Sequence, residues 1–329
     1  MAEAGALAYL GRRLLWALFL LAASSVFVYA VFWLVPANPA AIRPASPFSS
    51  PDAQAAVRNY LHLGDPIWKQ YTGFVWRILR HGSLGQSYWS RGSVDSIIAT
   101  DAPVTASLVL GSAVLWLALA LPLGVLAALH PRSLLDRAAT LLVLLGQSAH
   151  PVWVGLTLSY LVGYRLGLTP IEGYCNFFGG NAPGQCGGAV QWASHLILPW
   201  LTFMALFVAL YVRLIRATVS SNLAEDYVRT ARAKGAPERR VLIRHVLRNS
   251  LGPVVTIIGM DLGLAVGVAL FVENVFGLPG LGYEIVHAYQ FDDYPVIVGI
   301  VLFNAIVIVL LNLVVDIVYA VLDPRVRLA

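Results

Sequence analysis

Apolar residues in this chain fall into long unbroken runs, and the polar residues gather between them. Six runs reach the roughly 20 residues that an α-helix needs to cross a hydrocarbon core of about 30 Å. They cover residues 14–35, 105–129, 138–164, 195–212, 253–272 and 296–321. A membrane β-barrel would instead show short segments of alternating hydrophobicity. The pattern therefore predicts an all-α integral membrane protein with six transmembrane helices.

Composition excludes a water-soluble globule. Hydrophobic residues make up 58% of the 329 residues and charged residues only 12%, whereas a soluble domain has about 25% charged residues. The two cysteines exclude a disulfide framework and a cysteine-rich metal module. The run 14–35 is longer than the apolar core of a signal peptide, which has about 7 to 15 residues, so we interpret it as an uncleaved anchor.

The basic residues predict the orientation in the membrane, because Lys and Arg are retained on the cytoplasmic side. With the N-terminus inside, 15 of the 22 basic residues fall in cytoplasmic segments, and nine of these lie in the loop 213–250. Both termini are therefore expected in the cytoplasm. The predicted organisation is a cytoplasmic N-terminus (1–13), a first transmembrane helix (14–35), an extracytoplasmic loop with short helices (36–103), a five-helix transmembrane core (104–322) and a cytoplasmic C-terminus (323–329).

Two segments expected on the outer side carry distinctive residues. The loop 36–103 shows helix-like stretches near 52–63 and 67–79 and several aromatic residues, which favour a surface at the lipid headgroups. We interpret this loop as a cap on the bundle or as a docking surface for a substrate-carrying protein. Cys175 and Cys186 lie in a Gly-rich loop, where they either close a short disulfide or stay unpaired.

The loop 213–250 contains a segment that resembles a short docking helix. Asn222 and Glu225 have the spacing of a capping box, and Gly235 suits the left-handed residue that ends a helix. A helix of about 12 residues is predicted. Its apolar face is expected to carry Leu223, Tyr227 and Ala231. Topological retention and contact with anionic lipid are alternatives for the nine basic residues of the loop, and retention leaves the cap, the apolar face and the stop unexplained. A nucleic-acid interface is disfavoured, because no nucleic-acid-binding fold accompanies the charges.

Four motifs give the chain a family resemblance. The segment DYVRTARAKG (226–235) resembles the cytoplasmic loop of binding-protein-dependent ABC importer permeases, in the dipeptide, oligopeptide and nickel branch. The segments GSLGQS (82–87), ENVFGLPGLG (273–282) and DPRVR (323–327) agree with that branch. One departure is Ser83, which stands where the family usually has Asp. The resemblance extends along nearly the whole chain, while the departures blur which solute is carried.

The resemblance implies a type I ABC importer permease in a bacterial inner membrane. Its expected partners are a second homologous permease, cytoplasmic ATPase subunits and an extracytoplasmic substrate-binding protein. The expected solutes are di- or oligopeptides, with nickel or another small solute as the alternative. The helix that ends at Gly235 is expected to sit in a cleft of the ATPase. The residues expected to couple the two subunits are Leu223, Glu225, Asp226, Tyr227, Arg229, Thr230, Ala231, Lys234 and Gly235.

The chain itself is not expected to bind ATP or Mg²⁺, or to be an enzyme. A phosphate-binding loop needs Gly-Lys followed by Ser or Thr, and the only lysines are Lys69, followed by Gln, and Lys234, followed by Gly. No nucleophile–base arrangement and no metal-ligand spacing is present in the sequence. We therefore assign no catalytic residue, metal site or cofactor to this chain, and expect ATP and Mg²⁺ on the partner subunits.

The fifth apolar run carries a charged residue and a stripe of small ones. Asp261 lies near its middle, where a charge costs about 2.5–3.5 kcal/mol on insertion, so it is expected to face the bundle interior. There it lines a solute path, serves an ion-coupled carrier, or forms a hydrogen bond across a helix interface. Gly259, Gly263 and Gly267 predict close packing against a neighbouring helix or a second permease. The acidic loop 273–294 that follows either meets a basic partner or is solvated.

Overall fold

The computed structural model describes residues 2–34, 66–87, 89–134, 136–138, 141, 146, 150–179, 186–291 and 293–322. The regular structure in these ranges is helical, apart from two isolated backbone bridges. The helices are α1 (Ala2–Leu34), α3 (Ile67–His81), α4 (Val94–Leu129), α6 (Pro151–Leu158), the π-helix η1 (Ser159–Arg165), α7 (Ala189–Leu223), α8 (Asp226–Ala233), α9 (Glu238–Arg240), the π-helix η2 (Val241–Leu247), α10 (Arg248–Phe276), α11 (Leu281–Gln290) and α12 (Tyr294–Leu322). The all-α class predicted from the apolar runs is confirmed for the part of the chain that the structure describes.

Five helical stretches in the described ranges are long and apolar enough to cross a membrane. They are Gly11–Val31, Val94–Leu129, Ala189–Leu223, Glu238–Phe276 and Tyr294–Val315. Each overlaps one of the predicted spans. The chain is therefore a multi-pass membrane protein by the length and composition of its helices.

The predicted span 138–164 lies only partly within the described residues. Its second half forms α6, which begins after His150 and continues into η1. The ring Nδ1 of His150 accepts a hydrogen bond from the backbone N–H of Val152 at 3.3 Å, and Pro151 occupies the first turn, where its missing N–H costs nothing. In the described part of this segment, α6 therefore starts at Pro151, and His150 is not helical. Residues 36–65 of the predicted outer loop also lie outside the described residues.

Two spans begin or end well outside the predicted limits. α4 starts at Val94, so the predicted boundary of the outer loop at residue 103 falls inside a helix. The Ser93 side chain caps this start by accepting a hydrogen bond from the backbone N–H of Ser96 at 3.2 Å. α7 extends beyond both ends of the predicted run 195–212. The reason is that an apolar run marks only the part of a helix that needs lipid, while its polar ends continue into the headgroups and water.

The core lies between α4 and α7, which pack against each other along much of their length. Trp116 of α4 stacks on Phe207 of α7 with ring centroids 4.5 Å apart, and both side chains belong to the main buried cluster. Two glycines of α4 allow this approach: a Cβ on Gly111 would lie 2.4 Å from the Trp200 ring, and one on Gly124 would lie 2.7 Å from Ile215. Close backbone contact of this kind is typical of helix packing in membranes.

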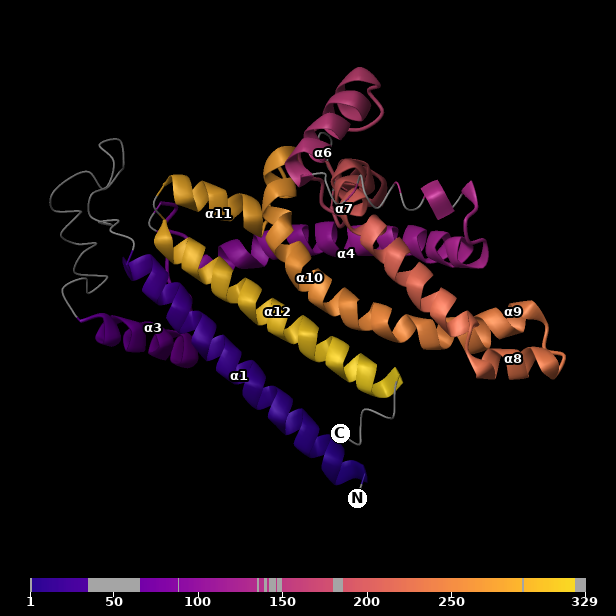
Figure 1. Cartoon of the computed structure of the whole chain (residues 1–329). Helices are drawn as coiled ribbons and strands as arrows, with labels where there is room; N and C mark the ends of the chain where they lie inside the picture. Colours follow the sequence, from indigo (N-terminus) through magenta and orange to yellow (C-terminus); the bar gives the residue numbers. More distant parts are fainter. Residues whose placement is uncertain are drawn as a thin grey trace.

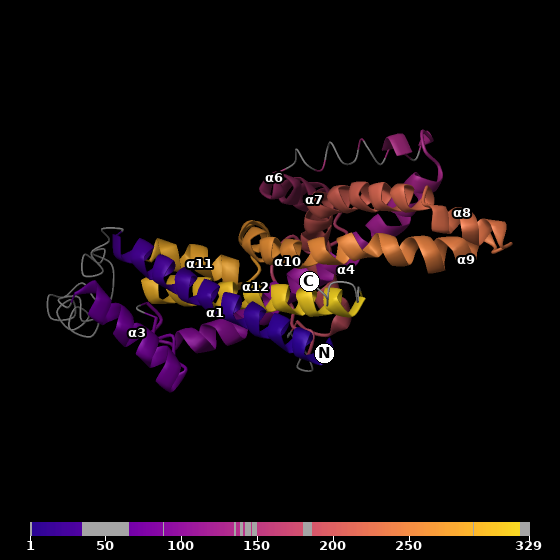
Figure 2. The ribbon, with the colours of Figure 1, turned by 60° about the horizontal axis from the view of Figure 1, so that its bottom comes forward.

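The remaining long helices pack outward from this pair, one beside the next. α10 packs on α7 and on α12, and α1 packs on the far side of α12 (Figure 1). Figures 1 and 2 both place α8 and α9 at one end of the molecule and α3 and α11 at the opposite end. The segment with α8 and α9 is therefore separated from α3 and α11 by the length of the apolar helices.

Candidate coupling surface and buried polar contacts

The loop between α7 and α10 folds into the short helix α8, followed by α9 and η2 (Figure 1). α8 runs from Asp226 to Ala233, with Asp226 in its first turn and Arg232 in its last, so both charges complement the helix dipole. Gly235 follows with a φ of +79°, a left-handed conformation that glycine adopts without steric cost. Gly235 therefore has the left-handed backbone conformation that was predicted for the residue ending this helix.

The predicted start of this helix is wrong. Asn222 belongs to the last turn of α7, where its Nδ2 donates to the carbonyl oxygen of Thr218 at 2.8 Å. Its Oδ1 accepts from the hydroxyl of Tyr227, also at 2.8 Å. Glu225 is the residue before α8, but its side chain makes no capping hydrogen bond. α8 consequently has eight residues instead of about 12.

Only one side of α8 is packed against the bundle. Val228 is fully buried and Ala231 is half-buried. The predicted apolar face is only partly right, because Leu223 belongs to α7 and Tyr227 is 36% exposed. The other predicted coupling residues are all exposed, and they are Glu225, Asp226, Arg229, Thr230, Lys234 and Gly235. The anchored helix thus presents a polar, charged surface to the outside of the bundle.

The turn after α8 joins this helix to α9, which leads into the bundle. Arg232 forms an ion pair with Glu238 of α9, with Nε 2.8 Å from Oε1. The backbone N–H of Ala236 donates to the carbonyl oxygen of Ala231 at 3.2 Å. α9, η2 and α10 then follow without a break in helical structure. α8 is therefore connected to α10 by this ion pair, the turn and a continuous helical segment.

A second connection on this side of the bundle joins residues 132–136 to α7. The guanidinium of Arg216 pairs with the carboxylate of Asp136, with Nε 2.5 Å from Oδ1 and Nη2 2.9 Å from Oδ2. The backbone N–H of Arg132 also donates to Asp136 Oδ2 at 2.9 Å. This backbone donor, together with Arg216, holds the pKa of Asp136 below its ordinary value against the opposing effect of burial. Sequence analysis missed this pair, because 80 residues separate its members.

At the opposite end of the molecule, a buried carboxylate holds three elements together. Glu273, in the last turn of α10, accepts from the Thr105 hydroxyl of α4 at 2.6 Å. Its other oxygen accepts from the backbone N–H groups of Gly282 and Tyr283 at 2.7 and 3.0 Å. These two donors belong to the first turn of α11, which has no helical partner for them. Thr105 in turn accepts from the backbone N–H of Leu281 at 2.9 Å.

The surroundings of Glu273 explain the glycines that follow it. A Cβ on Gly280 would lie 2.5 Å from the Glu273 carboxylate, and one on Gly282 would lie 2.4 Å from the backbone of Leu270. Neither position accepts a side chain without displacement of its neighbours. The predicted loop 273–294 is therefore a compact corner rather than a solvated segment. Its sequence signal was an acidic residue at the end of an apolar run, followed by closely spaced glycines.

Comparison with known proteins places the chain in a family. Residues 120–328 match the model of the binding-protein-dependent transport system inner membrane component, and residues 6–109 match the N-terminal model of the same membrane components. The chain belongs to this family. The membership confirms the resemblance stated from the sequence motifs and makes the chain a component of a transport system rather than its catalytic subunit.

Individual relatives are similar over nearly their whole length. The dipeptide transport system permease protein DppB of Escherichia coli K12 is 35% identical over 92% of this chain and 94% of its own length. The di/tripeptide transport system permease protein DppB of Pseudomonas aeruginosa is 33% identical with the same coverage. The oligopeptide transport system permease protein AppB of Bacillus subtilis is 33% identical over 97% of this chain and 99% of its own length.

The charged residue near the middle of the fifth predicted span lies at a helix interface. Asp261 of α10 accepts a hydrogen bond through Oδ2 from the hydroxyl of Tyr211 of α7 at 2.8 Å. Tyr211 is fully buried and lies 6.1 Å, centroid to centroid, from the Trp116 ring. A hydroxyl partner reduces the cost of a carboxylate at membrane depth. The structure thus shows the interfacial contact that was one of the predicted roles of Asp261.

Two of the three glycines in the predicted stripe pack within the chain. A Cβ on Gly259 would lie 2.5 Å from Val315, and one on Gly263 would lie 3.2 Å from Ile308, both of them residues of α12. Nothing lies within 4 Å of a Cβ on Gly267. The neighbour predicted from the stripe is therefore α12 for Gly259 and Gly263, and the second transport subunit remains a prediction for the rest of α10.

The acidic residues after α10 are less solvated than the sequence suggested. Asp293 is buried and accepts through Oδ2 from the Ser87 hydroxyl at 2.5 Å and from the backbone N–H of Trp89 at 3.2 Å. Glu284 is half-buried, and burial followed by the charge of Asp293 raises its pKa. Asp292 lies outside the described residues. The corner between α11 and α12 thus uses the carboxylate of Asp293 for internal contacts.

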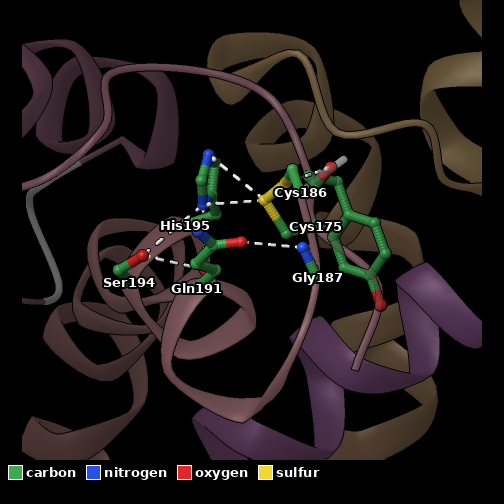
Figure 3. Close-up of a disulfide and its surroundings, with 7 residues drawn as sticks. Cys175, Cys186, Gly187, Gln191, Ser194 and His195 are labelled. Atoms are coloured by element: carbon green, nitrogen blue, oxygen red, sulfur yellow. Dashed lines mark hydrogen bonds between the residues drawn. A yellow bond between two sulfur atoms is a disulfide. The ribbon is translucent and has the colours of Figure 1, made fainter. Parts of the chain in front are cut away.

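A disulfide closes the loop before α7 (Figure 3). Cys175 and Cys186 are bonded, with their Cα atoms 5.3 Å apart. The backbone N–H of Gly187 donates to the side-chain oxygen of Gln191 at 2.7 Å, and the His195 ring lies 3.4 Å from the Cys175 sulfur (Figure 3). The ligand atoms of Cys175, Cys186 and His195 lie within 4.8 Å of one another. Sulfurs that are bonded to each other are not thiolates, so in this state the cluster is a covalent cross-link rather than a metal site.

Proposed function

We propose that this chain is a permease subunit of an ATP-driven ABC importer for peptides. The similarity to dipeptide, di/tripeptide and oligopeptide permeases over more than nine-tenths of the chain supports this function. A permease forms the path that the peptide takes through the membrane, together with a second, homologous permease. Nickel uptake and ion-coupled transport, the two alternatives raised by the sequence, have no comparable support among these relatives.

The exposed surface of α8 is the proposed contact with the ATPase subunit. Glu225, Arg229 and Lys234 are exposed and free of the packing that holds Val228 in the bundle. The ion pair between Arg232 and Glu238 connects α8 to α9, and α9 leads into α10. Closure of the ATPase on α8 would therefore move α10. The chain carries no Gly-Lys-Ser/Thr segment of its own, so ATP and Mg²⁺ are assigned to the partner.

This function fixes the proposed orientation. α8 faces the cytoplasm, where the ATPase resides, and the basic residues of the loop 213–250 agree with that side. α3, α11 and the disulfide loop then face the extracytoplasmic space, where an oxidising environment maintains disulfides. A substrate-binding protein delivers peptides at that face of a bacterial inner membrane.

The decisive experiment reconstitutes the permease with its native partner subunits in proteoliposomes. Uptake of a labelled dipeptide is measured with ATP present, with the ATPase inhibited, and after ionophores have collapsed the ion gradients. We expect uptake that depends on ATP and on the binding protein and survives the ionophores. Uptake by the purified chain alone, or uptake that the ionophores abolish, would overturn the proposal in favour of a self-sufficient carrier.

A further inference from the structure

Helix α3 is attached to the bundle by one face only. Phe74 and Ile78 pack against Val28 of α1 in a small hydrophobic cluster that also contains residues of α12. The hydroxyl groups of Tyr71 and Ser25 share a hydrogen bond of 2.8 Å. These contacts fix the position of α3 beside α1, at the end of the molecule remote from α8 (Figures 1 and 2). The proposed coupling mechanism makes no use of this helix.

The opposite face of α3 combines large apolar side chains with positive charge. Trp68, Trp76 and Leu79 are 66%, 60% and 77% exposed. Lys69 and Arg80 are also exposed, and the guanidinium of Arg80 lies 5.7 Å from the centre of the Trp76 ring. α3 contains no acidic residue. Exposed tryptophans beside basic residues are typical of a helix that lies in a membrane interface.

Helical geometry gives the face a definite order. Trp68 and Leu79 are eleven residues apart, as are Lys69 and Arg80, so at about 100° per residue each pair lies within about 20° of the same direction. Trp76 projects between the two pairs. Trp68 and Leu79 therefore form an apolar strip along α3, Lys69 and Arg80 form an adjacent basic strip, and Trp76 lies at the edge of the basic strip. Such an arrangement permits insertion of one strip into acyl chains while the other reaches phosphate groups.

The contacts with α1 set the depth of α3 in the bilayer. Ser25 and Val28 precede residue 35, the end of the apolar run 14–35, by ten and seven residues. At 1.5 Å per residue, the attachment points of α3 lie about 10 to 15 Å from that end, in the half of the run that is nearer to it. The 15 residues of α3 are too few to cross the membrane.

We infer that the exposed face of α3 binds anionic phospholipid in the leaflet at the Val31 end of α1. Trp68, Trp76 and Leu79 enter the acyl region, and Lys69 and Arg80 contact the headgroup phosphates. Continuity favours lipid over a protein partner, because the adjoining part of α1 also exposes apolar side chains, with Val26 51% and Phe27 69% exposed. Exposed apolar side chains of a membrane span face acyl chains wherever no partner subunit covers them, and the same lipid layer reaches α3.

The test uses the full-length chain in nanodiscs that contain phosphatidylcholine and a stepwise share of phosphatidylglycerol. In separate samples, one of the two lipids carries bromine on its acyl chains near the headgroup. Bromine quenches tryptophan fluorescence on contact. The difference between the chain and its Trp76→Phe variant isolates the signal of Trp76. We expect half-maximal quenching at a lower share of brominated phosphatidylglycerol than of brominated phosphatidylcholine.

The charge contribution is tested with Lys69→Gln, which leaves the contact between Arg80 and Trp76 intact. This variant should require about fivefold more phosphatidylglycerol, because each basic residue near an anionic surface contributes about that factor. Arg91→Gln is the matched control, since it removes an exposed arginine that is not on α3, and it should change nothing. Equal quenching by the two lipids, or an unchanged Lys69→Gln variant, would overturn the inference.

A remaining outcome concerns a protein partner. If neither lipid quenches Trp76, while addition of the substrate-binding protein shifts its emission, the face is a protein docking surface and the lipid assignment is wrong. These measurements need neither ATP nor peptide uptake. The lipid assignment and the proposed transport function can therefore fail independently.

Discussion

Individual polar residues hold this membrane protein together at points that no local sequence pattern marks. Thr105 and Glu273 are 168 residues apart, and Arg216 and Asp136 are 80 residues apart. The acidic character of residues 273–294 is visible in the sequence, but its burial is not. Which donors reach a carboxylate depends on how distant helices pack, and that information is absent from spacing alone.

The network around Glu273 predicts a loss of stability in Glu273→Gln. Glutamine keeps one accepting oxygen and replaces the other with an amide nitrogen, so the Thr105 hydroxyl or the two N–H groups of α11 lose their acceptor. Buried donors without a partner cost about 1–3 kcal/mol. We expect a lower midpoint of thermal unfolding for the purified chain in detergent. Glu284→Gln, in a half-buried residue of the same corner, is the control, and an equal loss in both variants would contradict the capping role.

The pair Asp136 and Arg216 predicts a pH-dependent contribution to stability. Because the pKa of Asp136 is lowered in the folded state, the pair stabilises the fold above the ordinary carboxyl pKa of 3.8 and loses this effect as the pH falls below it. Asp136→Asn should therefore lower the unfolding midpoint at neutral pH, and its difference from the unaltered chain should shrink in acid. A difference that is constant across the pH range would show that the charge of Asp136 is irrelevant.

At the scale of elements, the sequence predicted which segments are helical better than where they begin. The capping-box spacing at Asn222 was misleading, because α7 continues to bury side chains at Ile215 and Val219 beyond the predicted end of the span. Packing of this kind overrides a local capping preference. The stop at Gly235 was predicted correctly, since a left-handed residue is a property of the local backbone.

The turn after α8 leads to a prediction for Gly235→Val. A β-branched residue at a φ of +79° is strained by about 1–3 kcal/mol, so the turn should reorganise and displace α8 from the ATPase. We expect normal membrane insertion but ATP hydrolysis that no longer drives peptide uptake in the reconstituted complex. Gly235→Asn is the matched control, because Asn tolerates the left-handed region. Full coupling in the valine variant would count against α8 as the contact.

At the scale of the whole molecule, the sequence motifs predicted the family correctly. The predicted number of six spans exceeds the five candidate spans that the described residues contain. Family membership could be predicted because short segments such as residues 226–235 and 273–282 resemble motifs of the family. The six-helix count rested on hydropathy, and residues 138–164 contain a helix start at Pro151 that hydropathy does not detect. The side of the membrane on which each loop lies stays a prediction from the charges and from the proposed function.

Thiol labelling tests this orientation directly. In intact spheroplasts, a membrane-impermeant maleimide should not label the chain until a reductant opens the disulfide between Cys175 and Cys186. Labelling should then occur at Cys186, which is exposed. A Thr230→Cys variant on a cysteine-free background, with Cys175 and Cys186 replaced by Ser, should be labelled only after the membrane is opened. The reverse pattern at the two positions would invert the proposed topology.

The unbroken helical path from Glu238 to Phe276, which contains α9, η2 and α10 in 39 residues, has a consequence for communication across the bilayer. The turn proposed to contact the ATPase and the carboxylate of Glu273 lie at opposite ends of this helical path. We therefore expect a tilt at one end to affect the other. A substitution at Glu273 should therefore change the rate of ATP hydrolysis by the ATPase subunit, although Glu273 lies at the other end of the molecule from the proposed contact with that subunit.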